Sequence, residues 1–367
     1  MKSLLPVVAV LLLLTSCKAE FDPNAPWREV PVVYCVIDPD EDTVWVRLQR
    51  CFQGQENMYT YTTLPDSNYY LPSDVAVHLL AWDGASLLGA NPTAYATLAD
   101  RWELTCTETP RGLDSTAGVH LRPLYYCVPG EHLLADTGCL FQLVILRRSG
   151  NASSPSMDTL ATAFTSLVGV LPKTPTSRGL IERVITNPTY TRAHEFGFSV
   201  GCRGFLEWNP LPRGRFYQPF VTFHYQKNRD TLSITIPGIT ALAPFSGDHF
   251  VVRPFTEREF LSVIRQHLAS NTDTLYCVNN VDITLTVCNE DLYQYMRTQH
   301  HVSADGHELP AYSNINGGVG IFASRRTHIT VNVPADSAGN PDNLPQRLVD
   351  LGVGFYGRFR ISERVHG

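Results

Sequence analysis

Apolar and polar residues alternate with a period of two along much of the chain, which is the pattern of β-strands with one buried face. The first hairpin joins residues 30–37 to residues 44–49 through an acidic turn. In its second strand the alternation predicts that Val44, Val46 and Leu48 face the core. The chain therefore opens, after its first thirty or so residues, with an antiparallel strand pair.

The first half of the chain continues in the same way. Further strands are predicted at residues 74–82, 102–107, 119–127, 139–147 and 159–168. About seven short strands separated by turns are typical of an immunoglobulin-like or fibronectin-like β-sandwich, which we assign to residues 28–172. Residues 171–177 have the composition of a linker, so we place the domain boundary there.

The second half, residues 173–367, is predicted to be a second β-rich domain with two short helices. Its predicted strands include residues 196–200, 218–226, 231–236, 281–287, 329–333 and 354–361, with Asn279-Asn280 as a hairpin turn. A capping box begins a helix near 256–270, in which Phe260, Ile264 and Leu268 recur on one face. A second helix is predicted near 289–301. The fold class is therefore mainly β.

Composition excludes two classes of protein. Charged residues make up 17% of the chain and hydrophobic residues 44%, a balance that excludes a disordered chain. The formal net charge is −6 and no long Lys/Arg cluster is present, so no nucleic-acid partner is expected.

The first seventeen residues have the features of a secretory signal peptide. Lys2 precedes an apolar run of about a dozen residues, which is too short to span a bilayer. Residues 14–17 (Leu-Thr-Ser-Cys) resemble the lipobox of bacterial lipoproteins, in which the cysteine is acylated. We therefore expect Cys17 to be the first residue of the mature chain and to carry lipid such as palmitate, with residues 18–27 as a tether.

Eight of the nine cysteines remain after Cys17 is set aside. An even number in an exported protein permits a disulfide framework, although buried free thiols are the alternative in a chain of this size. We expect at least two disulfide bonds.

Several short runs resemble a family of uncharacterised two-domain lipoproteins of Bacteroidota cell envelopes, many of them encoded near TonB-dependent receptors. The runs are the lipobox, Val32-Val33-Tyr34, residues 52–57, the helix tyrosines Tyr293 and Tyr295, and above all Tyr312–Phe322. The resemblance implies a bacterial outer-membrane location, on its periplasmic or its surface face, and a receptor or other envelope protein as partner. The cysteine content is higher than is usual in the family, which has no established activity, so no catalytic residue carries over.

Residues 52–74 show no sustained period and contain four tyrosines among turn-forming residues. Long connections of this kind are often functional, and tyrosine offers a rigid contact surface at low entropic cost. We assign a ligand or partner surface to Tyr59, Tyr61, Tyr69 and Tyr70. The alternative is that these tyrosines cover one end of the sandwich.

Metal and cofactor motifs are weak or absent, so we assign neither. The weak candidates for zinc are His300, His301, His307 and Glu308, but the first two fall at a predicted helix C-terminus, where positive charge is favourable anyway. Asp38, Asp40 and Asp42 have a calcium-like spacing, yet the glycine and glutamate of an EF-hand loop are missing, and a solvated turn explains the same residues. The Gly-rich run 317–320 is predicted to be a strand entry with close backbone approach.

No nucleophile elbow, Walker loop, dinucleotide fingerprint or zinc-protease motif occurs. The sequence therefore favours a lipid-anchored, non-catalytic binding or accessory module of an outer-membrane transport complex. A structural or adhesive subunit that anchors a fibre is the first alternative. An envelope hydrolase with scattered catalytic residues is the second.

Overall fold

The structure is a computed structural model of the 367-residue chain. It describes residues 29–51, 68–84, 93, 96–110, 121–130, 138–151, 154–169, 181–185, 204–208, 210–238, 240–243, 251–255, 257–299, 312–334, 348–349 and 351–358. The predicted signal peptide, Cys17 and the tether lie outside these residues, and their assignments stay predictions.

The described chain is mainly β, as predicted, with two helices. The strands of its N-terminal part are β1 (Pro31–Ile37), β2 (Val44–Arg50), β3 (Val75–Asp83), β4 (Thr97–Glu103), β5 (Thr105–Pro110), β6 (Leu121–Cys127), β7 (Leu140–Asn151) and β8 (Ser154–Ser166). The later elements are β9 (Ile181–Ile185), β10 (Gly204–Trp208), β11 (Phe216–Lys227), β12 (Asp230–Pro237), β13 (Ala241–Leu242), β14 (Val251–Phe255), α5 (Glu257–His267), β15 (Leu275–Cys288), α6 (Glu290–Gln299), β16 (Ile315–Asn316), β17 (Val319–Pro334) and β18 (Phe355–Arg358).

The strands form three sheets. The largest has ten strands in the order β12-β11-β15-β17-β1-β2-β6-β5, with β13 paired to β11 and β18 paired to β15. A five-stranded sheet has the order β16-β8-β7-β3-β4, and a three-stranded sheet has the order β14-β10-β9. Sequence-distant strands are thus neighbours, since β1 lies between β17 and β2.

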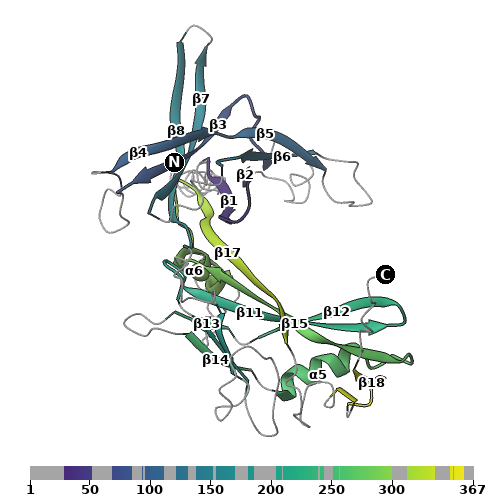
Figure 1. The fold of residues 1–367 in the computed structure, drawn as a ribbon. Helices are drawn as coiled ribbons and strands as arrows, with labels where there is room; N and C mark the ends of the chain where they lie inside the picture. Colours follow the sequence, from purple (N-terminus) through teal and green to yellow (C-terminus); the bar gives the residue numbers. More distant parts are fainter. Residues whose placement is uncertain are drawn as a thin grey trace, which may run out of the picture.

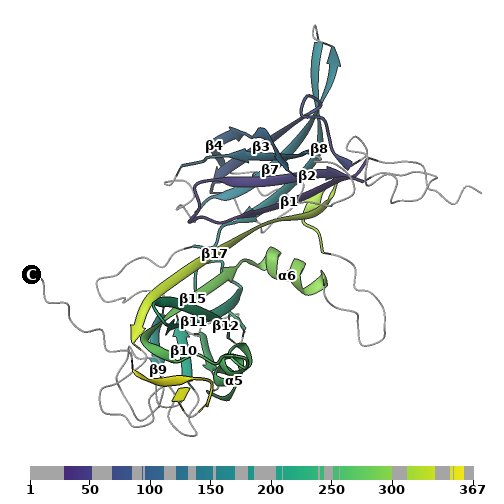
Figure 2. The ribbon, with the colours of Figure 1, turned by 90° about the vertical axis from the view of Figure 1, so that its right-hand side faces the viewer.

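Strand β17 connects the two parts of the molecule (Figures 1 and 2). Its first residues run parallel to β1, with Val319 opposite Val32. From Arg325 onward it runs antiparallel to β15, with Cys288 opposite Arg325. One continuous strand therefore completes the N-terminal sheet and then enters the sheet of the second part.

The N-terminal core lies between the five-stranded sheet and the β1 side of the ten-stranded sheet. Val44, Val46 and Leu48 are at most 2% exposed, which confirms the inward face predicted from their alternation. Ile315 and Phe322 belong to the same core, although they come from the second half of the sequence. The immunoglobulin-like or fibronectin-like assignment stays a prediction.

The second core lies between strands β11, β12 and β15 and helix α5. The predicted helix is confirmed, and Phe260, Ile264 and Leu268 turn its apolar face onto the sheet. Phe260 meets Phe223 of β11 edge to face, with ring centroids 6.3 Å apart. Helix α6 confirms the second predicted helix.

Two local predictions are wrong. Strand β15 continues through Asn279-Asn280 instead of turning there. Phe223 of β11 is opposite Val281 and Tyr225 is opposite Cys277, so β15 has extra residues at this point and they form a bulge. The strand predicted at residues 102–107 is interrupted at Leu104, where β4 ends in one sheet before β5 begins in the other.

The boundary predicted at residues 172 and 173 lies outside the described chain and stays a prediction. The described residues show that Leu167 belongs to the N-terminal core and Val168 to the second core, so the chain passes from one to the other between them. Residues 315–324 then return to the N-terminal part through β16 and the start of β17.

The expected disulfide framework is not formed among the described cysteines. All six whose side chains are described carry free thiols, namely Cys35, Cys51, Cys106, Cys127, Cys139 and Cys288. Four of the six are buried in apolar surroundings, where cysteine acts as a small hydrophobic residue. The expectation of at least two bonds is therefore wrong, because only Cys202 and Cys277 remain beyond these six and Cys17.

Candidate functional site

Both cores lie on the same face of the ten-stranded sheet. In β17, Phe322 points into the N-terminal core, and Arg326, on the same face, is opposite Val287 of the second core. Between the two cores this face carries Ser324 and Arg326. We use the name "joint" for this region around Ser324 and Arg326, where the two parts of the molecule meet.

Most of the buried polar side chains in the described part of the chain lie at the joint. Among the described residues, five polar or charged side chains are buried, and four of them are at the joint: Thr165, Asn289, Ser324 and Arg326. Because a buried polar group costs free energy unless it is paired, such a concentration specifies one arrangement of the two parts.

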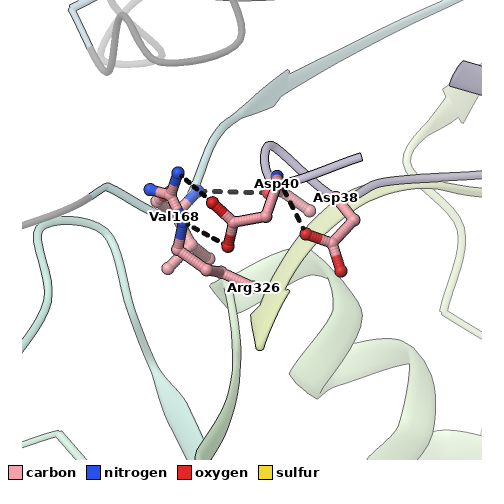
Figure 3. A network of polar contacts seen from close by, with 5 residues as sticks. Asp38, Asp40, Val168 and Arg326 are labelled. Carbon is pink, nitrogen blue, oxygen red and sulfur yellow. Dashed lines mark hydrogen bonds and ion pairs between the residues drawn. The ribbon is translucent and has the colours of Figure 1, made fainter. Parts of the chain in front are cut away.

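Arg326 makes the central contacts of the joint (Figure 3). Its Nε and Nη2 donate to the two carboxylate oxygens of Asp40, each at 2.9 Å, and its Nη1 donates to the Val168 carbonyl at 3.1 Å. Val168 N–H in turn donates to Ser324 Oγ at 3.1 Å. Side chains of β17 therefore bind Val168, where the chain first passes from the N-terminal core to the second core. We call Arg326, Asp40 and the Val168 carbonyl the Arg326 clamp.

The acidic turn places Asp40 against β17. Glu41 N–H donates to the Asp38 carbonyl at 3.1 Å and Asp40 N–H donates to Asp38 Oδ1 at 3.2 Å, which closes the turn as the sequence predicts. Asp38 also lies 3.6 Å from Arg325. These carboxylates thus pair with arginines, and the described residues contain no group of His, Cys, Asp and Glu able to hold a metal ion.

Asn289 attaches helix α6 to the joint. Its Oδ1 accepts from Leu292 N–H at 3.2 Å, which caps the helix N-terminus. Its Nδ2 donates to Thr165 Oγ1 at 2.8 Å, and its backbone N–H donates to the Ser324 carbonyl at 3.0 Å. The helix therefore begins at a position fixed by both β8 and β17.

Asp291 in the first turn of α6 is the acceptor of a second small network. Tyr312 Oη donates to Asp291 Oδ1 at 2.7 Å and Thr165 Oγ1 donates to Oδ2 at 3.2 Å. Burial raises the pKa of Asp291, and these hydrogen bonds oppose the shift. The carboxylate fixes the start of the Tyr312–Phe322 run against α6.

The rest of the Tyr312–Phe322 run has a structural role. Asn314 Nδ2 donates to the Phe322 carbonyl at 2.7 Å and Phe322 N–H donates to Asn314 Oδ1 at 2.9 Å. Gly320 has φ of 120° and packs against the backbone of Val33, so no side chain fits there. The predicted strand entry with close backbone approach is confirmed.

The opposite face of the sheet carries exposed aromatic residues on the N-terminal part. Trp45 on β2 is 43% exposed and lies opposite Tyr126 on β6, with ring centroids 5.2 Å apart. Tyr34 on β1 is 38% exposed and meets Tyr295 of α6 edge to face at 6.4 Å. Helix α6 lies beside β17 at the joint in both views (Figures 1 and 2).

We call the outward positions of β17, β1, β2 and β6 in the N-terminal part that are not buried the open face: Val319, Val32, Tyr34, Val36, Trp45, Arg47, Gln49, Arg122, Leu124 and Tyr126. Ile321 and Ala323, the next outward positions of β17, are buried. The sequence analysis did not identify it as a site. The available signal was Trp45, a large aromatic residue at a solvent-facing position of an alternating strand.

The tyrosines assigned to a binding loop are not brought together as one exposed surface. Tyr70 is 3% exposed and belongs to the N-terminal core, with the Arg50 guanidinium 5.9 Å from its ring centre. This corrects the assignment of Tyr70 as an exposed contact. Tyr69 is half-buried, and Tyr59 and Tyr61 lie outside the described residues.

The zinc candidates also lie outside the described residues, namely His300, His301, His307 and Glu308. In the part of the chain that the structure describes, no helix is long and apolar enough to cross a membrane.

Fold and joint together define a mainly β protein in which two cores share one face of a single sheet. The chain matches no protein-family model and no curated protein. The site must therefore be interpreted from its own chemistry.

Proposed function

We propose that this protein is a lipid-anchored lipoprotein of the bacterial outer membrane that acts as a non-catalytic binding or accessory module of a transport complex. The observation that carries the proposal is strand β17, which belongs to both parts and is fixed at the joint by the Arg326 clamp. A continuous strand whose buried arginine pairs with Asp40 favours one fixed arrangement of the two parts, which suits a scaffold.

The position of the first described residues indicates how a molecule anchored at Cys17 would be oriented. Cys51 N–H donates to the Val30 carbonyl, and Pro31 is opposite Arg50, so the chain enters the N-terminal part at this end of β1. The Asp40 turn and the joint lie at the other end of β1. A lipid on Cys17 would therefore place the second part on the side of the N-terminal part that faces away from the anchor.

The anchor is tested by labelling cells with a palmitate analogue and fractionating their envelopes. We expect label and a detergent requirement for extraction in the wild type, and loss of both in Cys17→Ala. Cys51→Ala is the matched control, because Cys51 is exposed and should leave labelling unchanged. Unlabelled, freely soluble wild-type protein would contradict the anchor.

The accessory role is tested by mild-detergent purification of the tagged wild type. We expect an outer-membrane receptor to co-purify, and we expect Arg326→Met to weaken that complex without releasing the protein from the membrane, since the variant loosens only the joint. Co-purification of fibre subunits would support the adhesive alternative instead.

A further inference from the structure

Exposed hydrophobic side chains gather on the open face. Among the described residues nine large hydrophobic side chains are exposed, and three of them occupy outward positions on the adjacent strands β17, β1 and β2. These are Val319, Tyr34 and Trp45, exposed by 42%, 38% and 43%. Contiguous exposed apolar groups on a folded protein mark an interaction surface more often than isolated ones do.

The charge of the open face differs from that of the whole chain. The formal net charge of the protein is −6, yet the charged residues on the open face are Arg47 and Arg122 only. Arg47 lies opposite Tyr34, and no described carboxylate forms an ion pair with it. The face therefore combines aromatic rings with positive charge, and it is complementary to an apolar surface bordered by acidic groups.

The size of the aromatic area fits the centre of a protein interface. A tyrosine or tryptophan side chain has roughly 150–250 Å² of surface, so the exposed fractions of Tyr34 and Trp45 leave on the order of 80–100 Å² each. With Val319 this is about a third of the roughly 800 Å² that one partner contributes to a standard interface. Aromatic residues and arginine are also the residues that dominate binding energy at such centres.

The packing of the aromatic rings on the open face favours a protein partner over a lipid surface. Insertion into a bilayer requires apolar groups that penetrate about 5–10 Å beyond their polar neighbours. Trp45 instead packs against Tyr126, and Tyr34 packs against Tyr295, so these rings lie against the protein. Aromatic rings held by their neighbours in this way suit a protein partner, because aromatic residues are enriched at the centres of protein interfaces.

We infer that the open face, centred on Tyr34, Trp45 and Arg47, is the docking surface for a folded protein partner that presents an apolar strip bordered by carboxylates. The inference rests on the proposed function, because it assigns a surface to the binding role of the module.

The test is photo-crosslinking in intact cells with p-benzoylphenylalanine in place of Trp45. The matched control carries the same group in place of Leu98, which is 45% exposed on β4 of the other sheet. We expect one discrete protein adduct from position 45 and none from position 98. In the position-45 protein, Arg47→Glu should lower the adduct yield roughly tenfold or more, and Arg47→Lys should retain most of it.

Four results would overturn the inference: equal adducts from both positions, no adduct, an adduct with a second copy of this chain, or an adduct with lipid. Binding of purified wild-type protein, but not Trp45→Ser, to vesicles of phosphatidylethanolamine and phosphatidylglycerol would also overturn it in favour of a membrane surface. Thermal melts of the Arg47 variants should match the wild type, because Arg47 is exposed.

The outcome is separable from the proposed function. If palmitate labelling and receptor co-purification persist while position 45 gives no adduct, the accessory module stands and the open face is not its docking surface. If labelling fails while position 45 still gives its adduct, the anchor is wrong and the docking surface stands.

Discussion

Replacing Asp40 by alanine would leave the buried Arg326 guanidinium without its carboxylate. The Arg326 side chain is 6% exposed and would keep only the Val168 carbonyl as acceptor. Breaking a buried ion pair from one side costs about 3–5 kcal/mol of unfolding free energy. The Asp40 side chain is 49% exposed, so the pair is partly solvated, and we expect the lower end, about 3 kcal/mol.

Arg326→Met should cost less than Asp40→Ala, although it removes the same ion pair. The Asp40 carboxylate would be solvated through its exposed half, and the methionine would fill much of the volume left by the arginine. The Val168 carbonyl would lose one hydrogen bond, so the unfolding free energy should fall by about 1–2 kcal/mol in total. The double variant leaves no buried charge, so it should be as stable as Arg326→Met alone. It should therefore be more stable than Asp40→Ala by about 1–2 kcal/mol.

The measurement is urea unfolding of the whole chain, followed by circular dichroism and by tryptophan fluorescence, with free energies from linear extrapolation. Coincident transitions by the two probes are required before free energies are compared. Arg148→Met is the control for an ion pair that is exposed on both sides. The Arg148 and Glu103 side chains are 41% and 57% exposed, so the loss of unfolding free energy should be below about 1 kcal/mol.

The reasoning is refuted if the two single effects simply add in the double variant. It is also refuted if Asp40→Ala lowers the unfolding free energy no more than Arg148→Met does, because the Arg326 guanidinium would then be solvated in the folded protein.

Three further outcomes follow from the fold. Gly320→Ala should prevent β17 from pairing with β1 and lower the melting temperature sharply, whereas Gly84→Ala, at φ of 71° in open space, should lower the unfolding free energy by only about 1 kcal/mol. Differential scanning calorimetry compares the two variants, and equal shifts in melting temperature would contradict the close approach of Gly320 to Val33. Burial raises the pKa of the Cys35 thiol, so a maleimide should modify Cys51 in the native protein and Cys35 only after unfolding, as peptide mass spectrometry would show. Burial also raises the pKa of Asp291, so at a pH between the unfolded and folded pKa values the folded protein holds a proton there that the unfolded chain has released. The resulting stability is present below the unfolded pKa, near 4, and is lost as pH rises through the folded pKa, so Asp291→Asn should remove this part of the pH dependence in urea titrations at graded pH.

Local structure could be predicted where the residues of one strand or helix are enough to show which of its faces is buried. The alternation of Val44, Val46 and Leu48 determines which side of β2 is buried, and the spacing of Phe260, Ile264 and Leu268 determines the buried side of α5. These patterns depend only on residues close in sequence, and the structure confirms them.

The joint could not be predicted because its partners are far apart in the sequence. Nothing near Arg326 indicates that Asp40, 286 positions away, supplies its carboxylate. An isolated arginine in a strand is usually solvated, so its burial is a tertiary property. Tyr70 was misassigned for a similar reason, because a tyrosine beside a loop can cover a core or bind a partner, and only packing decides between them.

The parallel pairing of β1 with β17 also determines the order in which the protein can fold. Val32 must find Val319, so the N-terminal core lacks one of its strands until almost the whole chain is available. Closing a segment of this length costs about 5 kcal/mol of chain entropy, and such non-local contacts form late. A fragment ending at the predicted boundary would lack β16, β17 and Phe322, and would leave the edge of β1 unpaired. We therefore expect that the N-terminal part does not fold as an independent unit, and that the emerging chain needs its own C-terminal third to become resistant to aggregation and proteolysis.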